Sequence, residues 1–101
     1  MLTSKQRAGL RGLASRLDTN LHIGKSGITE TVIKQMDESL TAHELVKGKV
    51  LENSLLSARE ACDALAEACK ADQVQVIGSK FVLYRANTKI AKDKRIKLVK
   101  D

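Results

Sequence analysis

Four consecutive residues, Gly24-Lys25-Ser26-Gly27, have the types and spacing of a loop that could contact phosphate. Glycine has no Cβ atom, so a sugar–phosphate backbone could come close to the main-chain N–H groups of such a loop. Lys25 would add a cation and Ser26 a hydroxyl donor. A helix predicted to begin near Ile28 would direct its unpaired N–H groups and partial positive charge toward the same place. The segment is therefore a candidate contact for a nucleic-acid backbone, and a plain turn is the alternative.

A second Gly-x-x-Gly segment, Gly9-Leu10-Arg11-Gly12, shows that the bare pattern has little specificity. This copy lies inside a predicted helix and follows no strand. The segment at 24–27 instead lies between a predicted strand and a predicted helix. Because of this context, we favour phosphate contact over a plain turn for the segment at 24–27.

Catalytic and metal-binding patterns find little support in the sequence. His22 and His43 have no nucleophile at a spacing typical of a known catalytic family, and neither G-x-x-x-x-G-K-[ST] nor G-x-G-x-x-G occurs. Cys62 and Cys69 lie seven residues apart on the apolar face of a predicted helix, without a C-x-x-C pair. We predict buried thiols, no metal or cofactor, and a protein that is not an enzyme. A zinc site that joins the cysteines to the histidines is the alternative.

The charge of the chain is unevenly distributed. The net charge is +6, with +4 in residues 1–27, −4 in residues 28–72 and +6 in residues 73–101. If the fold brings the two basic ends together, one face becomes strongly positive, which suits a polyanion. Charge that is simply solvated is the alternative.

The chain has only two aromatic residues, Phe81 and Tyr84. Platforms that stack nucleobases are therefore nearly excluded, and recognition would have to depend on backbone contacts. The two residues fall on opposite faces of one predicted strand. We expect one in the core and one at the surface, with Phe81 the better candidate for the core.

Hydrophobic periodicity predicts the elements that position these residues. Three helices are expected: one that Thr3 or Ser4 could cap, one over about 28–43, and one between 54 and 71 whose start Ser57 and Glu60 could cap. Strands are expected at 21–23, 45–51, 74–77 and 81–84. The order α-β-α-β-α-β-β predicts an α/β (α+β) fold in which a four-stranded mixed sheet packs against helices. The predicted apolar stripes of the first and third helices are Leu10, Leu13, Ala14 and Leu17, and Leu55, Ala58, Cys62, Leu65 and Cys69.

A chain of 101 residues with 43% hydrophobic content has room for one domain. We assign residues 1–86 to the domain and residues 87–101 to a basic C-terminal tail. No apolar run of membrane-spanning length and no signal-peptide pattern is present. We therefore expect a cytoplasmic monomer that binds neither a membrane nor a small-molecule substrate.

Together these segments resemble the CRM-domain family, and within it the stand-alone bacterial YhbY-type proteins. The resemblance covers about residues 3–86. It implies a KH-like fold with RNA contacts through the glycine loop and the neighbouring basic surface. For single-domain bacterial members it also implies association with precursors of the large ribosomal subunit. The resemblance rests on Ser4-Lys5-Gln6-Arg7 with Leu13-Ala14, on Ile23-Gly24-Lys25-Ser26-Gly27-Ile28-Thr29, on His43-Glu44-Leu45-Val46-Lys47, and on Val74-Gln75-Val76-Ile77-Gly78 followed by Val82-Leu83-Tyr84-Arg85.

The sequence and the resemblance lead to one functional expectation. We expect a non-catalytic RNA-binding protein that acts in assembly of the large ribosomal subunit through contacts with the rRNA backbone. A general RNA chaperone or translation-associated factor, and a protein–protein adaptor, are the alternatives.

The family usually has a branched apolar residue where this chain has Gly48, which predicts a weakened strand or a β-bulge there. The residues predicted to contact RNA are Lys5, Arg11, Gly24, Lys25, Ser26, Gly27, Lys80 and Arg85.

Overall fold

The helices begin where the sequence supplies a capping side chain. The computed structural model describes residues 2–86, in which the helices are α1 (Ser4–Ala14), α2 (Glu30–His43) and α3 (Ala58–Cys69). Thr3, Thr29 and Ser57 precede them, and each accepts a hydrogen bond from a backbone N–H of the first turn. The capping box predicted for Ser57 and Glu60 is confirmed. None of these helices is long and apolar enough to cross a membrane.

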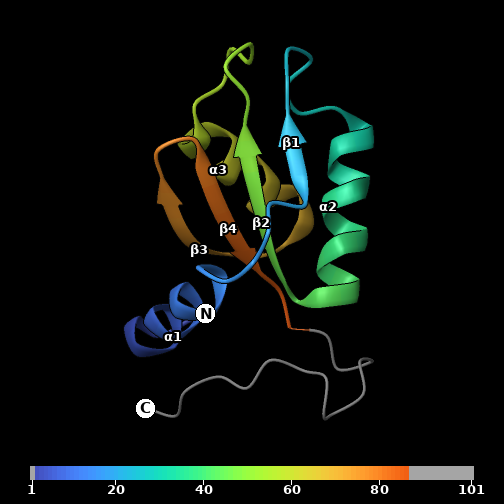
Figure 1. Ribbon diagram of the computed structural model, residues 1–101. Coiled ribbons are helices and arrows are strands. Elements are labelled where there is room, and N and C mark those ends of the chain that lie inside the picture. Colours follow the sequence, from blue (N-terminus) through green and yellow to red (C-terminus); the bar gives the residue numbers. More distant parts are fainter. Residues whose placement is uncertain (1, 87–101) are drawn as a thin grey trace.

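The strands of the described chain form one mixed sheet (Figure 1). They are β1 (Leu21–Ile23), β2 (Leu45–Val50), β3 (Asp72–Ile77) and β4 (Lys80–Tyr84), and their order in the sheet is β1-β2-β4-β3. β1 is parallel to β2, whereas β4 is antiparallel to both β2 and β3. The predicted element order and the four-stranded mixed sheet are therefore confirmed.

The two faces of the sheet are covered unequally (Figure 1). α2 and α3 pack against one face and build the larger core around Met36, Leu65 and Phe81. α1 covers only part of the other face, where Leu10 joins Tyr84 in a smaller cluster. Because α1 is short, the rest of this second face has no helix over it among residues 2–86 (Figure 1).

The predicted apolar stripes are wrong at three leucines. Leu13, Leu17 and Leu55 are 42%, 38% and 93% exposed. α1 ends at Ala14 and Ser57 caps α3, so Leu17 and Leu55 lie outside the helices to which the periodicity assigned them. Leu13 lies within α1 but off its buried face, which Leu10 and Ala14 form, so the periodicity is wrong inside this helix as well as beyond the helix ends.

The prediction for the aromatic pair is correct for one residue and wrong for the other. Phe81 is fully buried in the larger core, as expected. Tyr84 lies on the opposite face, but it is only 3% exposed because it packs in the cluster beneath α1. Neither aromatic side chain is therefore available at the surface.

The bulge considered at Gly48 does not occur. β2 pairs with β4 in a regular register through Gly48 and Phe81, and the irregularity of the sheet lies between Gln73 and Gln75 of β3. A Cβ atom at position 48 would lie 2.8 Å from Cε2 and 2.9 Å from Cε1 of Phe81, closer than real Cβ contacts. The glycine therefore makes room for the ring of Phe81 in the core.

We predict that Gly48→Ala lowers the free energy of unfolding by about 1–3 kcal/mol, because the added methyl group overlaps a buried ring. Urea denaturation followed by circular dichroism measures the change. Gly12→Ala is the matched control, since a Cβ atom there meets nothing within 4 Å and alanine favours the helix by up to about 1 kcal/mol. Equal stability of Gly48→Ala and the parent would show that the ring does not require the glycine.

Candidate nucleic-acid interface

The loop at 24–27 is held at both ends by backbone hydrogen bonds. At its start, the carbonyl of Ile23 accepts a hydrogen bond from the N–H of Leu51 at 2.8 Å. The N–H of Gly27 donates to the carbonyl of Gly24 at 3.0 Å and closes the turn. Thr29 then caps α2 by accepting from the N–H of Val32 at 3.2 Å. The loop therefore has a defined shape next to the N-terminus of α2, as predicted from its position between a strand and a helix.

The two glycines of the loop differ in whether the fold requires a glycine at that position. Gly27 has a backbone φ of +68°, a conformation that residues other than glycine rarely adopt. Gly24 has no such constraint, and a Cβ atom there would make only ordinary contacts, 3.7 Å from Oδ1 of Asn53. The fold itself therefore does not require glycine at position 24. Close approach of a ligand to the backbone would be a reason for glycine there.

The polar side chains of the loop point into solvent. Lys25 and Ser26 are both exposed. The N-terminus of α2 carries a partial positive charge beside them. Glu30, exposed in the first turn of α2, reduces this positive potential. The loop thus presents one cation, one hydroxyl and a helix N-terminus to an anion.

A lysine pair lies at the same end of the sheet. Lys49 of β2 and Lys80 of β4 are register partners, and β1 ends beside them because Ile23 pairs with Val50. Residues directly opposite each other in a sheet share a face, and like charges at such positions are destabilising. Neither lysine forms an ion pair within residues 2–86, where the ion pair present joins Arg85 to Asp37. An anion bound over the pair would relieve this repulsion.

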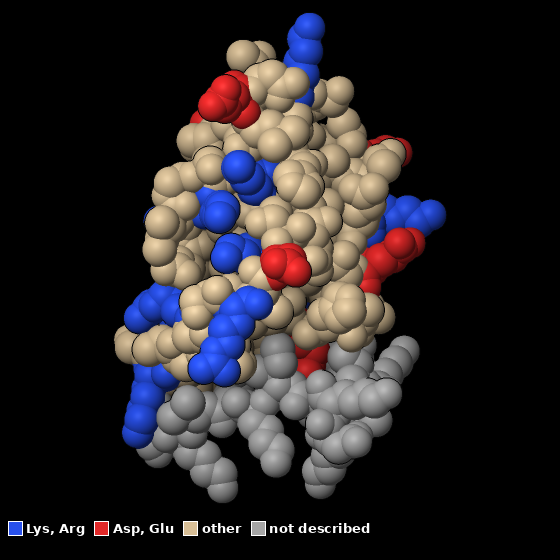
Figure 2. Space-filling model, in the orientation of Figure 1, with Lys and Arg blue, Asp and Glu red and all other residues tan. Residues whose placement is uncertain are grey.

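The lysine pair belongs to a surface that we call the open face, defined by His22, Lys47, Lys49 and Lys80. Side chains alternate along a strand, so these residues lie opposite the buried ones that face α2 and α3. Lys47 also donates to the carbonyl of Ala14 at 3.5 Å, near the C-terminus of α1. Figure 2 shows basic side chains spread over this side of the molecule, from α1 to the upper part of the sheet, with few acidic ones among them.

The remaining predicted residues lie in two different places. Lys5 and Arg11 are exposed on α1, which covers the same side of the sheet as the open face. Arg85 instead follows β4, and its guanidinium contacts α2 and α3. Nη1 donates to Oδ1 of Asp37 at 2.7 Å and to the carbonyl of Cys69 at 2.8 Å, and Nη2 donates to Oγ1 of Thr41 at 2.9 Å and to the carbonyl of Asp37 at 3.0 Å. Through these hydrogen bonds, Arg85 joins the end of β4 to α2 and α3.

Lys49 belongs to the open face but not to the predicted RNA-contact set, which also leaves out His22 and Lys47. Its alternation with Val50 in the sequence indicates that it faces away from the core. Its position opposite Lys80, however, depends on the pairing of two strands that are distant in the chain. That pairing has no local signal in the sequence.

The cysteines are core residues. Cys62 and Cys69 are buried, as predicted, and Sγ of Cys69 lies 3.7 Å from the carbonyl of Ile33. Burial, reinforced by the nearby carboxylate of Asp63, raises the pKa of Cys62 to about 11. The Cys62 thiol is therefore protonated at neutral pH, which makes it a weak nucleophile. Residues 2–86 contain no group of three or more His, Cys, Asp or Glu residues that could hold a metal ion.

Three comparisons relate the chain to known proteins. Residues 2–85 match the CRS1 / YhbY (CRM) domain family. The chain is 39% identical over 85 residues to "Probable RNA-binding protein YqeI" of Bacillus subtilis, an alignment that covers 84% of this chain and 88% of the relative. It is 38% identical over 84 residues to an RNA-binding protein of Haemophilus influenzae, covering 83% and 85%. The solved structure of the hypothetical protein SAV1595 from Staphylococcus aureus matches with a TM-score of 0.79 and 42% identity, over 98% of this chain and 100% of that one.

We predict that Arg85→Lys lowers the free energy of unfolding by about 1–3 kcal/mol, because lysine cannot reproduce the fork of donors that reaches Asp37, Thr41 and Cys69. Urea denaturation measures the loss. Lys34→Ala is the control, and its stability should stay within about 0.5 kcal/mol of the parent because this side chain is exposed on α2. Unchanged stability of Arg85→Lys would contradict the structural role of Arg85.

Proposed function

This chain belongs to the CRS1 / YhbY (CRM) domain family, and on that premise we propose that it is a non-catalytic RNA-binding protein that acts in assembly of the large ribosomal subunit. The relatives from Bacillus subtilis and Haemophilus influenzae are named as RNA-binding proteins, which supports RNA as the ligand. The resemblance to stand-alone bacterial YhbY-type proteins supports the ribosomal role. We further propose that residues 1–86 act as one RNA-binding domain, in a monomer in the cytoplasm.

The observation that carries the proposal is the position of the glycine loop and the lysine pair at one end of the same sheet. The loop would hold one phosphate through its free N–H groups, Lys25 and Ser26, with the N-terminus of α2 behind it. Lys49 and Lys80 would neutralise a neighbouring phosphate of the same strand. Charge-assisted contacts of this kind bind more strongly than neutral hydrogen bonds.

The lack of exposed aromatic rings in residues 2–86 supports recognition through the RNA backbone. Phe81 and Tyr84 are both buried, so bases cannot stack on them. Binding would depend on the sugar–phosphate backbone, which tolerates sequence variation and weakens as salt rises. A protein of this kind would recognise the path of an RNA strand more than its base sequence.

The RNA surface would continue from the open face onto α1. Lys5 and Arg11 are exposed on that helix, and α1 carries no acidic residue. Arg85 is the one predicted RNA contact that we leave out of the proposed surface, because its donors are already bonded to α2 and α3. The proposed set is Lys5, Arg11, Gly24, Lys25, Ser26, Gly27, Lys49 and Lys80.

We predict that Lys25→Asp combined with Ser26→Asp lowers RNA affinity by about tenfold to several hundredfold, because charge-assisted contacts are lost and two carboxylates repel phosphate. Both glycines and the Thr29 cap remain, and acidic residues near a helix N-terminus are stabilising, so the variant should fold. Fluorescence anisotropy with labelled single-stranded RNA measures affinity, and circular dichroism checks the fold.

Lys34→Asp combined with Gln35→Asp is the matched control for the loop variant. Both residues are exposed on α2, and the pair changes the net charge by the same amount as the loop variant. This control should lose much less affinity. A folded loop variant that binds within about twofold of the parent, a difference of ~0.4 kcal/mol, would show that the loop is only a turn.

The ribosomal part of the proposal is tested in cells. Ultraviolet crosslinking, purification of the protein and sequencing of the attached RNA should recover mainly rRNA of the large subunit. Recovery of scattered messenger RNAs would instead support a general RNA chaperone. Binding to other proteins that survives nuclease treatment, without recovered RNA, would support an adaptor.

A further inference from the structure

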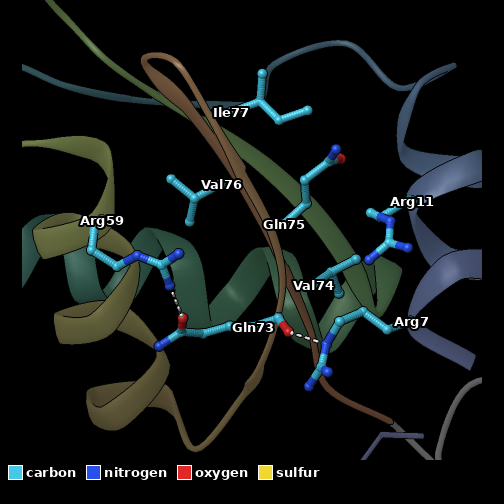
Figure 3. A pocket seen from close by; sticks show the side chains of 8 residues that line it. All are labelled: Arg7, Arg11, Arg59, Gln73, Val74, Gln75, Val76 and Ile77. Atoms are coloured by element: carbon cyan, nitrogen blue, oxygen red, sulfur yellow. Dashed lines mark hydrogen bonds between the residues drawn. The ribbon is translucent and has the colours of Figure 1, made fainter. Parts of the chain in front are cut away.

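The free edge of the sheet on the β3 side lies in a groove between α1 and α3 (Figure 3). β3 is an edge strand, because the sheet order is β1-β2-β4-β3. The groove has a volume of about 450 Å³, and five consecutive β3 residues, 73–77, form its floor. Arg7 and Arg11 of α1 and Arg59 of α3 complete its lining. We call it the arginine groove.

The main chain of β3 faces the groove. The carbonyl of Gln73 accepts a hydrogen bond from Nε of Arg7 at 3.0 Å, which shows that this carbonyl points outward from the sheet (Figure 3). The free edge of a strand presents N–H and C=O groups that another strand can pair with. Nη1 of Arg59 donates to the side-chain oxygen of Gln73 at 3.2 Å from the other wall. The floor of the groove is therefore strand backbone with an arginine on either side.

The two walls of the groove differ in charge. α1 carries Lys5, Arg7 and Arg11 and no acidic residue, so its net charge is +3. α3 carries Arg59 against three acidic residues, so its net charge is −2. One of these acids, Asp63, accepts from the side-chain amide of Gln73 at 2.6 Å. Within residues 2–86 none of the three groove arginines forms an ion pair with a carboxylate.

We propose that the arginine groove binds an extended segment of a partner protein, which adds to β3 as a fifth strand and directs acidic side chains toward α1. Alternate side chains of an added strand point to opposite faces, so the segment would carry its carboxylates at every second position. The guanidinium of Arg11, together with the Arg7 nitrogens that Gln73 does not use, would bind these carboxylates. Ile77, which is 63% exposed at the end of β3, would contact an aliphatic residue of the segment.

The same features favour a peptide over RNA in this groove. RNA has no main chain that could pair with the N–H and C=O groups of β3. It also carries a charge on every nucleotide and could not keep its phosphates away from Asp63 and the acidic α3 wall. An alternating peptide can place its carboxylates on the basic side only. This inference shares Arg11 with the proposed RNA surface but uses no other residue of that surface.

The test uses the full chain and a short fluorescein-labelled peptide in which valine and glutamate alternate. Anisotropy should show saturable binding, and amide hydrogen exchange should slow in residues 73–77. A peptide with lysine in place of glutamate should bind at least tenfold more weakly. A valine–glutamate peptide N-methylated at every residue should lose binding, because neither of its edges can donate main-chain hydrogen bonds to β3.

Variants of the protein identify the wall that binds the peptide. Arg7→Glu should weaken binding of the valine–glutamate peptide at least tenfold, whereas Lys70→Glu, outside the groove, should leave it unchanged. The N-methylated peptide tests the proposal on the unaltered chain if Arg7→Glu fails to fold. Absence of binding, equal binding of all three peptides, or protection outside β3 would overturn the proposal. Protection of residues 73–77 by RNA, with displacement of the peptide, would also overturn it and assign the groove to RNA.

Discussion

The two central strands pair with the ring of Phe81 against Gly48, where any larger residue would overlap the ring. β2 and β4 meet in the middle of the sheet, and the ring of Phe81, the largest of the fully buried side chains, lies against β2 at Gly48. A slip of one residue would move every side chain of a strand to the opposite face. The next register pair after Gly48 and Phe81 is Lys49 and Lys80. The packing of the core therefore sets the position of the proposed phosphate contacts.

The unequal covering of the sheet makes these contacts accessible. Two helices cover one face completely enough to bury Phe81 and Leu83, whereas α1 covers the other face only near Tyr84. The uncovered strands can then carry lysines, which could not lie beneath a helix without the cost of burying their charge. Because α1 is short, one face of the sheet is packed against α2 and α3, whereas part of the other face stays exposed and can bind a ligand (Figures 1 and 2).

Local signals in the sequence predict the elements well and their mutual placement less well. Caps and periodicity identified the helices, and the glycine loop was placed correctly between β1 and α2. Leu17 and Leu55 were assigned to helices because an apolar pattern does not show where a helix ends. The roles of Lys49 and Arg85 depend on contacts between segments far apart in the chain, as between Arg85 and Asp37. Their charge is visible in the sequence, but their partners are set by the tertiary fold.

We propose that RNA binds across the glycine loop and the lysine pair, on the side of the sheet opposite α2 and α3. The most direct measurement is a ¹H–¹⁵N NMR titration of the isotope-labelled protein with a short single-stranded RNA. We expect progressive shift changes at residues 24–27, at Lys49 and at Lys80, with little change on the exposed sides of α2 and α3. Shift changes confined to α2 and α3, with the loop unaffected, would contradict it.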